Sequence, residues 1–140
     1  MFLVAFWLAV LSGCSNNEDV IPHHEELSGL SLVGQSEQIF RKDESGWDDG
    51  VHLTIYQFQQ EGIASIQEAI SNDAAWLALP LSDRGKELFK KIVLPQNDMF
   101  SSIENVEGYY KIVVADSPGD YYFLIYDSNK NQLVVIFYRN

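Results

Sequence analysis

The chain contains a single cysteine, Cys14, among 140 residues, so it can form no internal disulfide and no zinc site built on several thiolates. Basic residues are also scarce. Nine Lys and Arg stand against twenty Asp and Glu, which gives a formal net charge of −11. A surface of this charge repels nucleic acid, so the sequence argues against a nucleic-acid partner and favours a basic protein or peptide. The same acidity is also typical of secreted proteins that charge keeps soluble.

Long apolar runs are missing as well. The stretch from Phe2 to Leu11 would cover, as a helix rising ~1.5 Å per residue, only about half of the roughly 30 Å core of a bilayer. Its length is that of a signal-peptide hydrophobic region rather than of a membrane span. No Lys or Arg precedes it, which departs from the usual signal peptide.

Leu11-Ser12-Gly13-Cys14 follows directly on this run and resembles the lipobox of bacterial lipoproteins. The resemblance implies cleavage between Gly13 and Cys14, removal of residues 1–13, and acylation of the Cys14 thiol. Two or three acyl chains suffice for stable anchoring. The sequence therefore predicts a protein held at the membrane by a lipid on Cys14, on the extracytoplasmic side of the bacterial cell envelope.

Residues 14–35 show neither helical nor strand periodicity and are rich in polar side chains, so they are expected to form a flexible acidic tether. A flexible segment of this length has a reach on the order of 25 Å. His23 and His24, followed by Glu25 and Glu26, are metal-ligand types, but adjacent ligands on a mobile segment have no imposed geometry. The sequence therefore predicts no metal site here.

Residues 36–140 are expected to form a single α+β domain. Alternating or β-branched runs predict strands at 38–41, 51–58, 109–115, 121–126 and 133–138, and apolar stripes at helical spacing predict two helices at 63–72 and 82–93. The last two strands lack a polar face, which indicates central positions covered on both sides. The predicted architecture is an antiparallel sheet of four or five strands with both helices on one face.

The covering of the second sheet face decides between two alternatives. If the chain leaves that face open, Tyr56, Tyr109 and Tyr121 form an exposed aromatic docking surface. If the 14–35 segment or the 96–107 loop lies over it, only scattered tyrosines remain exposed. The sequence leaves both alternatives open.

Residues with catalytic or metal-binding chemistry are few. Asp127, Asn129 and Asn131 match the first half of a calcium loop, but Gln132 occupies the glycine position, so a hairpin turn is favoured. A second group of possible metal ligands consists of Asp43, Glu44, Asp48, Asp49 and His52. For this group a solvated acidic loop is favoured over a weak calcium site. No phosphate loop, dinucleotide fingerprint or nucleophile elbow occurs, so the sequence predicts no cofactor and no catalytic residue.

Residues 47–138 have an arrangement similar to that of small uncharacterised bacterial proteins, which implies one compact domain. Asp48-Asp49-Gly50 leads into a strand, and Leu79-Pro80-Leu81 precedes a tyrosine-rich hairpin. The function favoured is a membrane-tethered module that binds a protein or peptide, for example as an immunity or inhibitor lipoprotein. The alternatives are an envelope hydrolase that uses His52 with Asp48 or Asp49, and a structural envelope lipoprotein.

Overall fold

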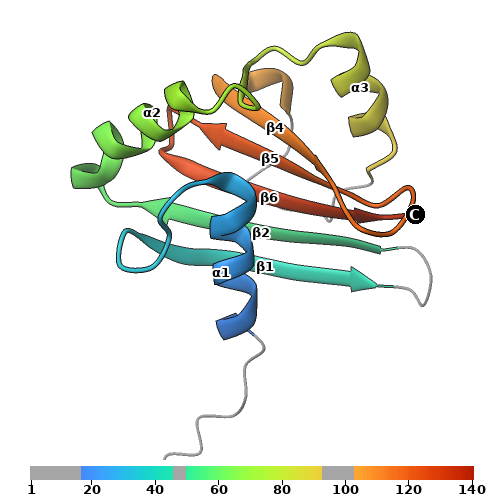
Figure 1. Cartoon of the computed structure of the whole chain (residues 1–140), viewed down its shortest axis with the longest axis horizontal. Coiled ribbons are helices and arrows are strands. Elements are labelled where there is room, and N and C mark those ends of the chain that lie inside the picture. The colour runs from blue at the N-terminus through green and yellow to red at the C-terminus, as the bar shows by residue number, and fades with distance from the viewer. Residues whose placement is uncertain (1–16, 46–49, 93–102) are drawn as a thin grey trace, which may run out of the picture.

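A six-stranded antiparallel sheet organises the chain in the computed structural model, which describes residues 17–45, 50–92 and 103–140 (Figure 1). The strands lie side by side in the order β1-β2-β6-β5-β4-β3, and each neighbouring pair is antiparallel. Their bounds are β1 Ser36–Ser45, β2 Gly50–Phe58, β3 Leu77–Ala78, β4 Gly108–Val114, β5 Tyr121–Asp127 and β6 Gln132–Arg139.

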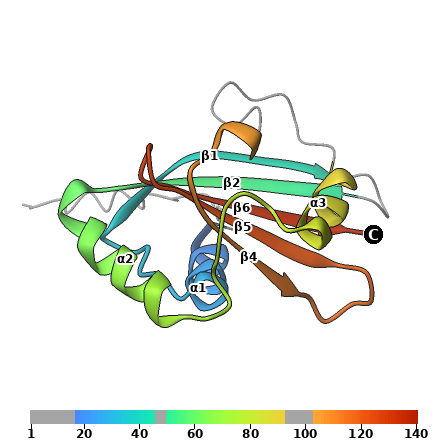
Figure 2. The ribbon, with the colours of Figure 1, turned by 90° about the horizontal axis from the view of Figure 1, so that it is seen from above.

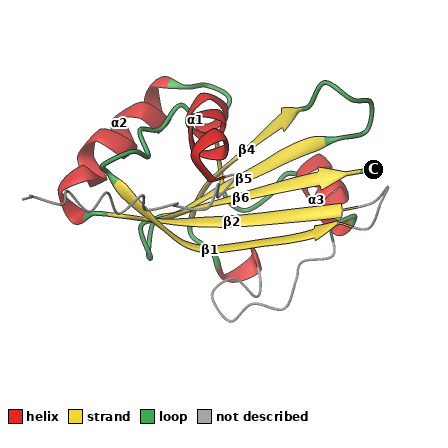
Figure 3. Cartoon of the chain, turned by 90° about the horizontal axis from the view of Figure 1, so that it is seen from below, coloured by secondary structure: helices red, strands yellow, loops and turns green. Residues whose placement is uncertain are grey.

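Helices cover both faces of this sheet. On one face lie α1 (Asn17–Ser28) and α2 (Ile63–Asn72), and on the other lie α3 (Asp83–Lys90) and the 3-10 turn η2 (Ile103–Asn105), as Figures 2 and 3 show. A further 3-10 turn, η1 (Gln60–Gly62), leads into α2. In the ranges described, no helix combines the length and apolar character needed to cross a bilayer.

The predicted α+β class with an antiparallel sheet is confirmed, while the number and placement of elements need correction. The sheet has six strands rather than four or five, because the two-residue β3 pairs with β4 at the edge. The described residues form three α-helices rather than two, and α2 and α3 lie on opposite faces instead of sharing one. Their apolar stripes show that each helix packs on the sheet, but they do not show on which face.

The long connection between β2 and the meander carries both of these helices, and β2 then pairs with β6. The strand β2 therefore lies beside the last strand of the chain, and β1 forms the edge of the sheet next to it. As expected, β5 and β6 are central: Leu124, Val135, Phe123 and Ile136 are all buried, the first pair on the α1 side and the second on the α3 side. The two faces therefore hold two separate hydrophobic clusters.

The expectation of a flexible tether is corrected for residues 17–35. Residues 17–28 form α1, and the loop after it carries Leu30 and Leu32, which are 3% and 1% exposed, into the core. The buried face of α1 includes His24 and Ser28, four residues apart, with Ile21 half-buried beside them. Because two of these residues are polar, the helical spacing is not visible as an apolar stripe.

The turn between β5 and β6 confirms the interpretation of Asp127, Asn129 and Asn131 as a hairpin turn. The Asp127 Oδ1 atom accepts hydrogen bonds from the backbone N–H groups of Asn129 and Lys130, at 3.0 and 3.1 Å. Asn131 has φ of 53° in the left-handed region, where asparagine is one of the few tolerated residues. Its carboxamide oxygen accepts from the Tyr126 hydroxyl at 2.6 Å.

Candidate functional site

The chain has three histidines, and all three line one pocket of about 340 Å³ between α1 and the sheet. The groups that line it come from α1 and from four strands. They are Val20, His23 and His24 of α1, Arg41 of β1, His52 and Thr54 of β2, Tyr122 of β5, and Phe137 of β6. We call this site the three-histidine pocket.

Strand register builds the floor of the pocket. His52 of β2 pairs with Phe137 of β6, which pairs in turn with Tyr122 of β5. Directly opposed residues of antiparallel strands point to the same face, so these three rings form one row across the sheet. The ring centroids are 5.7 Å apart for His52 and Phe137, and 4.6 Å apart for Phe137 and Tyr122. Two residues along β2 from His52, and so on the same face, Thr54 pairs with Arg41 of β1.

The first helix supplies the other two histidines. Consecutive residues of an α-helix point about 100° apart, so His23 and His24 reach different strands. The His24 Nδ1 atom lies 2.6 Å from the Tyr56 hydroxyl in a buried hydrogen bond. The His23 Nε2 atom lies 2.9 Å from the Tyr122 hydroxyl in an exposed one. Two side-chain hydrogen bonds therefore hold α1 over the pocket.

Burial controls the protonation of His24. Desolvation is the main cause that lowers the pKa of His24 from 6.5 to about 4, and the neighbouring charges of His23 and Arg41 contribute to the same shift. Burial raises the pKa of Tyr56 to about 12, against the lowering effect of Arg41 and with a raising effect of Glu25. Both partners of the buried hydrogen bond are therefore neutral at pH 7. The bond contains one hydrogen atom, which one partner donates and the other accepts.

The lining of the pocket is unusual for so acidic a protein. Among the residues whose side chains the structure describes, the lining includes one arginine and three histidines and no aspartate or glutamate, although acidic residues outnumber basic ones twenty to nine in the whole chain. In the strand register, Asp43 of β1 stands opposite His52. Imidazole and guanidinium groups donate hydrogen bonds to oxyanions, and Phe137 and Val20 add apolar surface. The pocket therefore gathers titratable and hydrogen-bonding groups beside an apolar surface.

The three tyrosines of the predicted aromatic surface do not form one. Tyr56 and Tyr121 are buried, at 1% and 6% exposure, and they lie on opposite faces of the sheet. The Tyr121 hydroxyl donates to the backbone oxygen of Leu88. Tyr109 of β4, which pairs with Ala78 of the edge strand β3, is 37% exposed. Of the two alternatives, the structure therefore shows the covered face, and part of the expected tether, α1, does the covering.

Other predicted site residues lie outside the described residues, namely Gly13, Cys14, Asp48 and Asp49. Of the residues in the hydrolase hypothesis, which pairs His52 with Asp48 or Asp49, the structure places only His52, which lines the three-histidine pocket. For the possible metal ligands His23, His24, Glu25 and Glu26, the structure shows the Glu25 carboxylate accepting from the backbone N–H of Leu32 at 2.8 Å. No three acidic, histidine or cysteine side chains in the described ranges are grouped to hold a metal ion.

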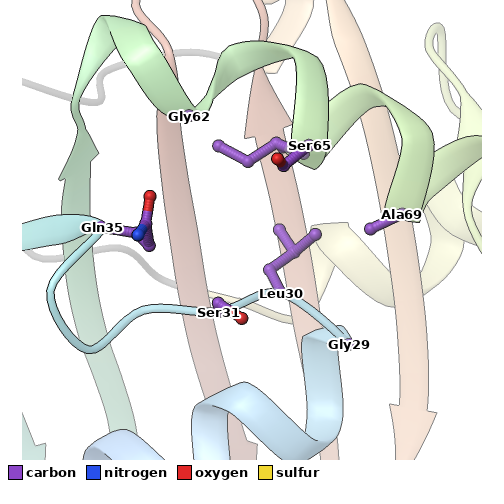
Figure 4. Close-up of a pocket in the computed structure, with 8 residues that line it drawn as sticks. Gly29, Leu30, Ser31, Gln35, Gly62, Ser65 and Ala69 are labelled. Atoms are coloured by element: carbon purple, nitrogen blue, oxygen red, sulfur yellow. The ribbon is translucent and has the colours of Figure 1, made fainter.

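A second hollow, of about 240 Å³, lies between α2 and the loop that follows α1 (Figure 4). Leu30 and Ser65 come from opposite sides of it, and the Gln35 side chain extends toward Gly62. Its full lining is Gly29, Leu30, Ser31, Gln35, Gly62, Ser65, Ile66 and Ala69. None of these side chains is charged or nucleophilically activated, so the hollow offers shape but little chemistry.

A third hollow, of about 430 Å³, lies on the opposite sheet face beside α3 and η2. Its floor is apolar, with Leu79, Leu81, Phe89, Ile103 and Val106. Two lysines and two glutamates also line it, so their formal charges cancel: Lys86, Lys90, Glu104 and Glu107. It is larger than the three-histidine pocket, but it does not gather titratable groups of one kind.

Sequence reasoning missed the three-histidine pocket because it assigned His23 and His24 to a mobile segment. A usable signal was present in the spacing of Ile21, His24 and Ser28, which is helical once a histidine and a serine are admitted to the buried face. The alternation of β2 also placed His52 and Tyr56 on one face, as the structure confirms.

Comparison with known proteins adds no family. No protein-family model matches the chain, and neither a curated protein nor a solved structure shows significant similarity to it. The functional argument therefore depends on the geometry of the chain itself.

Proposed function

We propose that this protein is a lipid-anchored binding protein of the bacterial envelope, and that the three-histidine pocket is its ligand site. The observation that carries the binding role is the convergence of His23, His24 and His52 with Arg41 on one pocket. Titratable groups gathered in a hollow are a frequent property of functional sites. The anchor is the acyl group expected on Cys14.

The size of the pocket favours a small ligand over a protein surface. A volume of about 340 Å³ lies at the lower end of small-molecule pockets, which span roughly 300–1,000 Å³. The exposed large hydrophobic side chains, by contrast, do not line this pocket; they are Val33, Leu77, Tyr109 and Val114. A small molecule, or a single group of a larger partner, therefore fits the site better than the peptide surface expected from sequence.

Because α1 begins close to Cys14, a lipid on Cys14 would also fix where the pocket lies relative to the membrane. Only residues 15 and 16 separate Cys14 from Asn17, the first residue of α1. Three residue steps span at most about 10 Å when fully extended, compared with the reach of about 25 Å expected for a flexible tether. Acylation of Cys14 would therefore hold α1, and the pocket beneath it, close to the lipid headgroups.

Mass spectrometry of the protein extracted from its native cells tests both parts. The intact mass should show residues 1–13 removed and Cys14 acylated, and native spectra should show a bound molecule of a few hundred daltons. The bound mass should be lost in Arg41→Gln and kept in Arg84→Gln, which changes an exposed arginine on α3. An unmodified Cys14 would overturn the anchor. A bound mass unaffected by Arg41→Gln, or the absence of any, would overturn the assignment of the pocket.

A further inference from the structure

We propose that the outer edge of β4, over residues 111–114, pairs antiparallel with the same edge of a second copy of this chain. The two sheets then continue into each other across a twofold axis. This proposal concerns a surface of the sheet edge, and it depends neither on a ligand in the three-histidine pocket nor on a lipid at Cys14.

The hydrogen bonds of β4 show which of its backbone groups point away from β5. On the β5 side, the N–H of Ala115 donates to the backbone oxygen of Asp120 at 3.0 Å. On the β3 side, the N–H of Leu79 donates to the backbone oxygen of Gly108 at 2.9 Å. Because the bonding direction alternates along an antiparallel strand, odd-numbered residues of β4 bond to β5 and even-numbered residues face the opposite side.

The short strand β3 occupies only the beginning of this outer side. It pairs with β4 at Tyr109 and Tyr110 and extends no further. The outward N–H and C=O groups of Ile112 and Val114 lie beyond it, and within the described ranges no strand pairs with them there. The Val114 side chain is 74% exposed, and Figure 2 shows this end of β4 standing clear of α1 and α2.

The two edges of the sheet differ in their protection against pairing. Charged side chains and bulges are the features by which edge strands avoid each other. At the other edge, β1 has a register irregularity between Gln38 and Phe40, followed by the run Arg41-Lys42-Asp43-Glu44. The register of β4 with β5 is unbroken, and its one charged residue, Lys111, is held by Asp73 at 2.8 Å.

Apolar side chains also gather at the edge that β3 and β4 form. Of the four large hydrophobic side chains that are exposed in the described residues, three lie there, namely Leu77, Tyr109 and Val114. The open residues 112–114 are Ile, Val and Val, which favour strands. This composition suits pairing with another apolar strand better than contact with water.

A second copy fits this edge because the open segment is complementary to itself. A twofold axis at Val113 places Ile112 of each copy opposite Val114 of the other, on the same sheet face. These two pairs would form about four backbone hydrogen bonds, and each Ile112 would cover an exposed Val114. Lys111 then lies opposite Ala115 and next to Asp116 of the second copy, which has the opposite charge. The chain of that copy turns away after Ala115, so it does not run into β3.

The total charge opposes this association. Each copy has a formal net charge of −11, so two copies repel each other, and dissolved salt screens that repulsion. We therefore expect a dimer whose affinity rises with ionic strength, which is the reverse of the salt dependence of an interface between oppositely charged partners.

Sedimentation equilibrium of the full chain tests the dimer and its position. The protein is measured over a concentration series in a density-matched neutral detergent, with micelles in excess over protein. Val114→Lys, at an exposed position that leaves the fold intact, should weaken the dimer by at least about tenfold. Val33→Lys is the matched control, because Val33 is a valine of similar exposure, 68%, in the loop after α1, and it should dimerise as the parent does.

Amide hydrogen exchange across the same concentration series tests the register. The amides of Ile112 and Val114 should be protected only where the dimer is populated. The amides of Lys111 and Val113, which face β5, should be protected at every concentration. This pattern of alternate residues distinguishes strand pairing from a dimer that buries β4 in another way.

Three results would overturn the proposal. A chain that stays monomeric over the whole series, at low and at high salt, has no second copy at this edge. A Val114→Lys protein that dimerises like the parent uses another surface. Protection of Ile112 and Val114 that does not depend on concentration, or that appears only when a different protein is added, assigns the edge to another segment or another partner.

Discussion

His24 and Tyr56 lie 32 positions apart in the sequence and share a buried 2.6 Å hydrogen bond across the interface between α1 and β2. Their rings meet edge to face, with centroids 5.7 Å apart. The neighbouring residue forms a parallel contact: His23 bonds to Tyr122 on β5, but at an exposed position. The chain thus contains two chemically matched links between α1 and the sheet that differ in burial.

This pair gives a matched comparison of hydrogen-bond strength. Tyr56→Phe leaves the buried His24 Nδ1 atom without its partner, which should cost about 1–3 kcal/mol in the free energy of unfolding. Tyr122→Phe leaves the His23 Nε2 atom to solvent, and should cost less than about 1 kcal/mol. Urea denaturation at pH 7.5 measures both. Equal losses in the two variants would contradict the assigned difference in burial.

The low pKa of His24 predicts that the protein loses stability in mild acid. The folded pKa is about 4 and the ordinary value is 6.5, so the unfolded chain binds the extra proton first as the pH falls. Stability from this group is therefore complete above pH 6.5 and falls by up to about 3 kcal/mol toward pH 4.

The measurement compares urea denaturation at pH 7.5 and pH 4.5 in the parent protein and in His24→Asn. The amide can form a hydrogen bond but does not titrate, so the variant should lose most of this part of the pH dependence. His23→Asn leaves the buried imidazole in place and should keep it. If His24→Asn shows the same fall in stability as the parent protein, other groups account for the acid sensitivity.

The sheet was largely predictable from sequence, whereas its edges and coverings were not. Period-two alternation in β2 and the β-branched and aromatic runs of β4 to β6 identify these strands with their order along the chain. The two-residue β3 is too short to carry any periodicity. The apolar stripes of α2 and α3 predict packing, but the choice of sheet face depends on the path of the connections.

The three-histidine pocket was missed for a different physical reason. A buried polar side chain is tolerated only where a partner satisfies it, and the partner of His24 is tertiary, whereas those of Ser28 are local and exist only once α1 and the loop after it have formed. His24 depends on Tyr56, and the Ser28 hydroxyl donates to the backbone oxygen of His24 at 2.7 Å while accepting from the N–H of Leu30 at 3.1 Å. Without knowledge of those contacts, residues 17–28 have the composition of a solvated segment.

Asn131 provides a prediction at the β5–β6 turn. Asn131→Ala removes the acceptor of the buried Tyr126 hydroxyl and places alanine at φ of 53°, so it should destabilise the protein by about 2–4 kcal/mol. Asn131→Gly relieves the backbone and should recover part of that loss. Asn129→Ala, in the same turn but exposed, is the control and should cost less than about 0.5 kcal/mol. Equal stability of the alanine and glycine variants at position 131 would show that the φ angle contributes nothing.

Trp76 ties the end of α1 to the segment after α2, and its removal should loosen the helix selectively. The indole Nε1–H donates to the backbone oxygen of Ser28 at 3.0 Å, in a buried contact. Trp76→Phe keeps an aromatic ring in the core but leaves this carbonyl, which belongs to the last turn of α1, without its donor. Hydrogen exchange should therefore accelerate in the amides of α1 by more than in those of β5 and β6, because local opening then requires less free energy than global unfolding.

Leu77→Ala, at the exposed neighbouring position, should leave both sets of amides near their parent rates. A uniform acceleration across α1, β5 and β6 would instead show that α1 opens only when the whole sheet unfolds, and that the cover of the three-histidine pocket does not move independently.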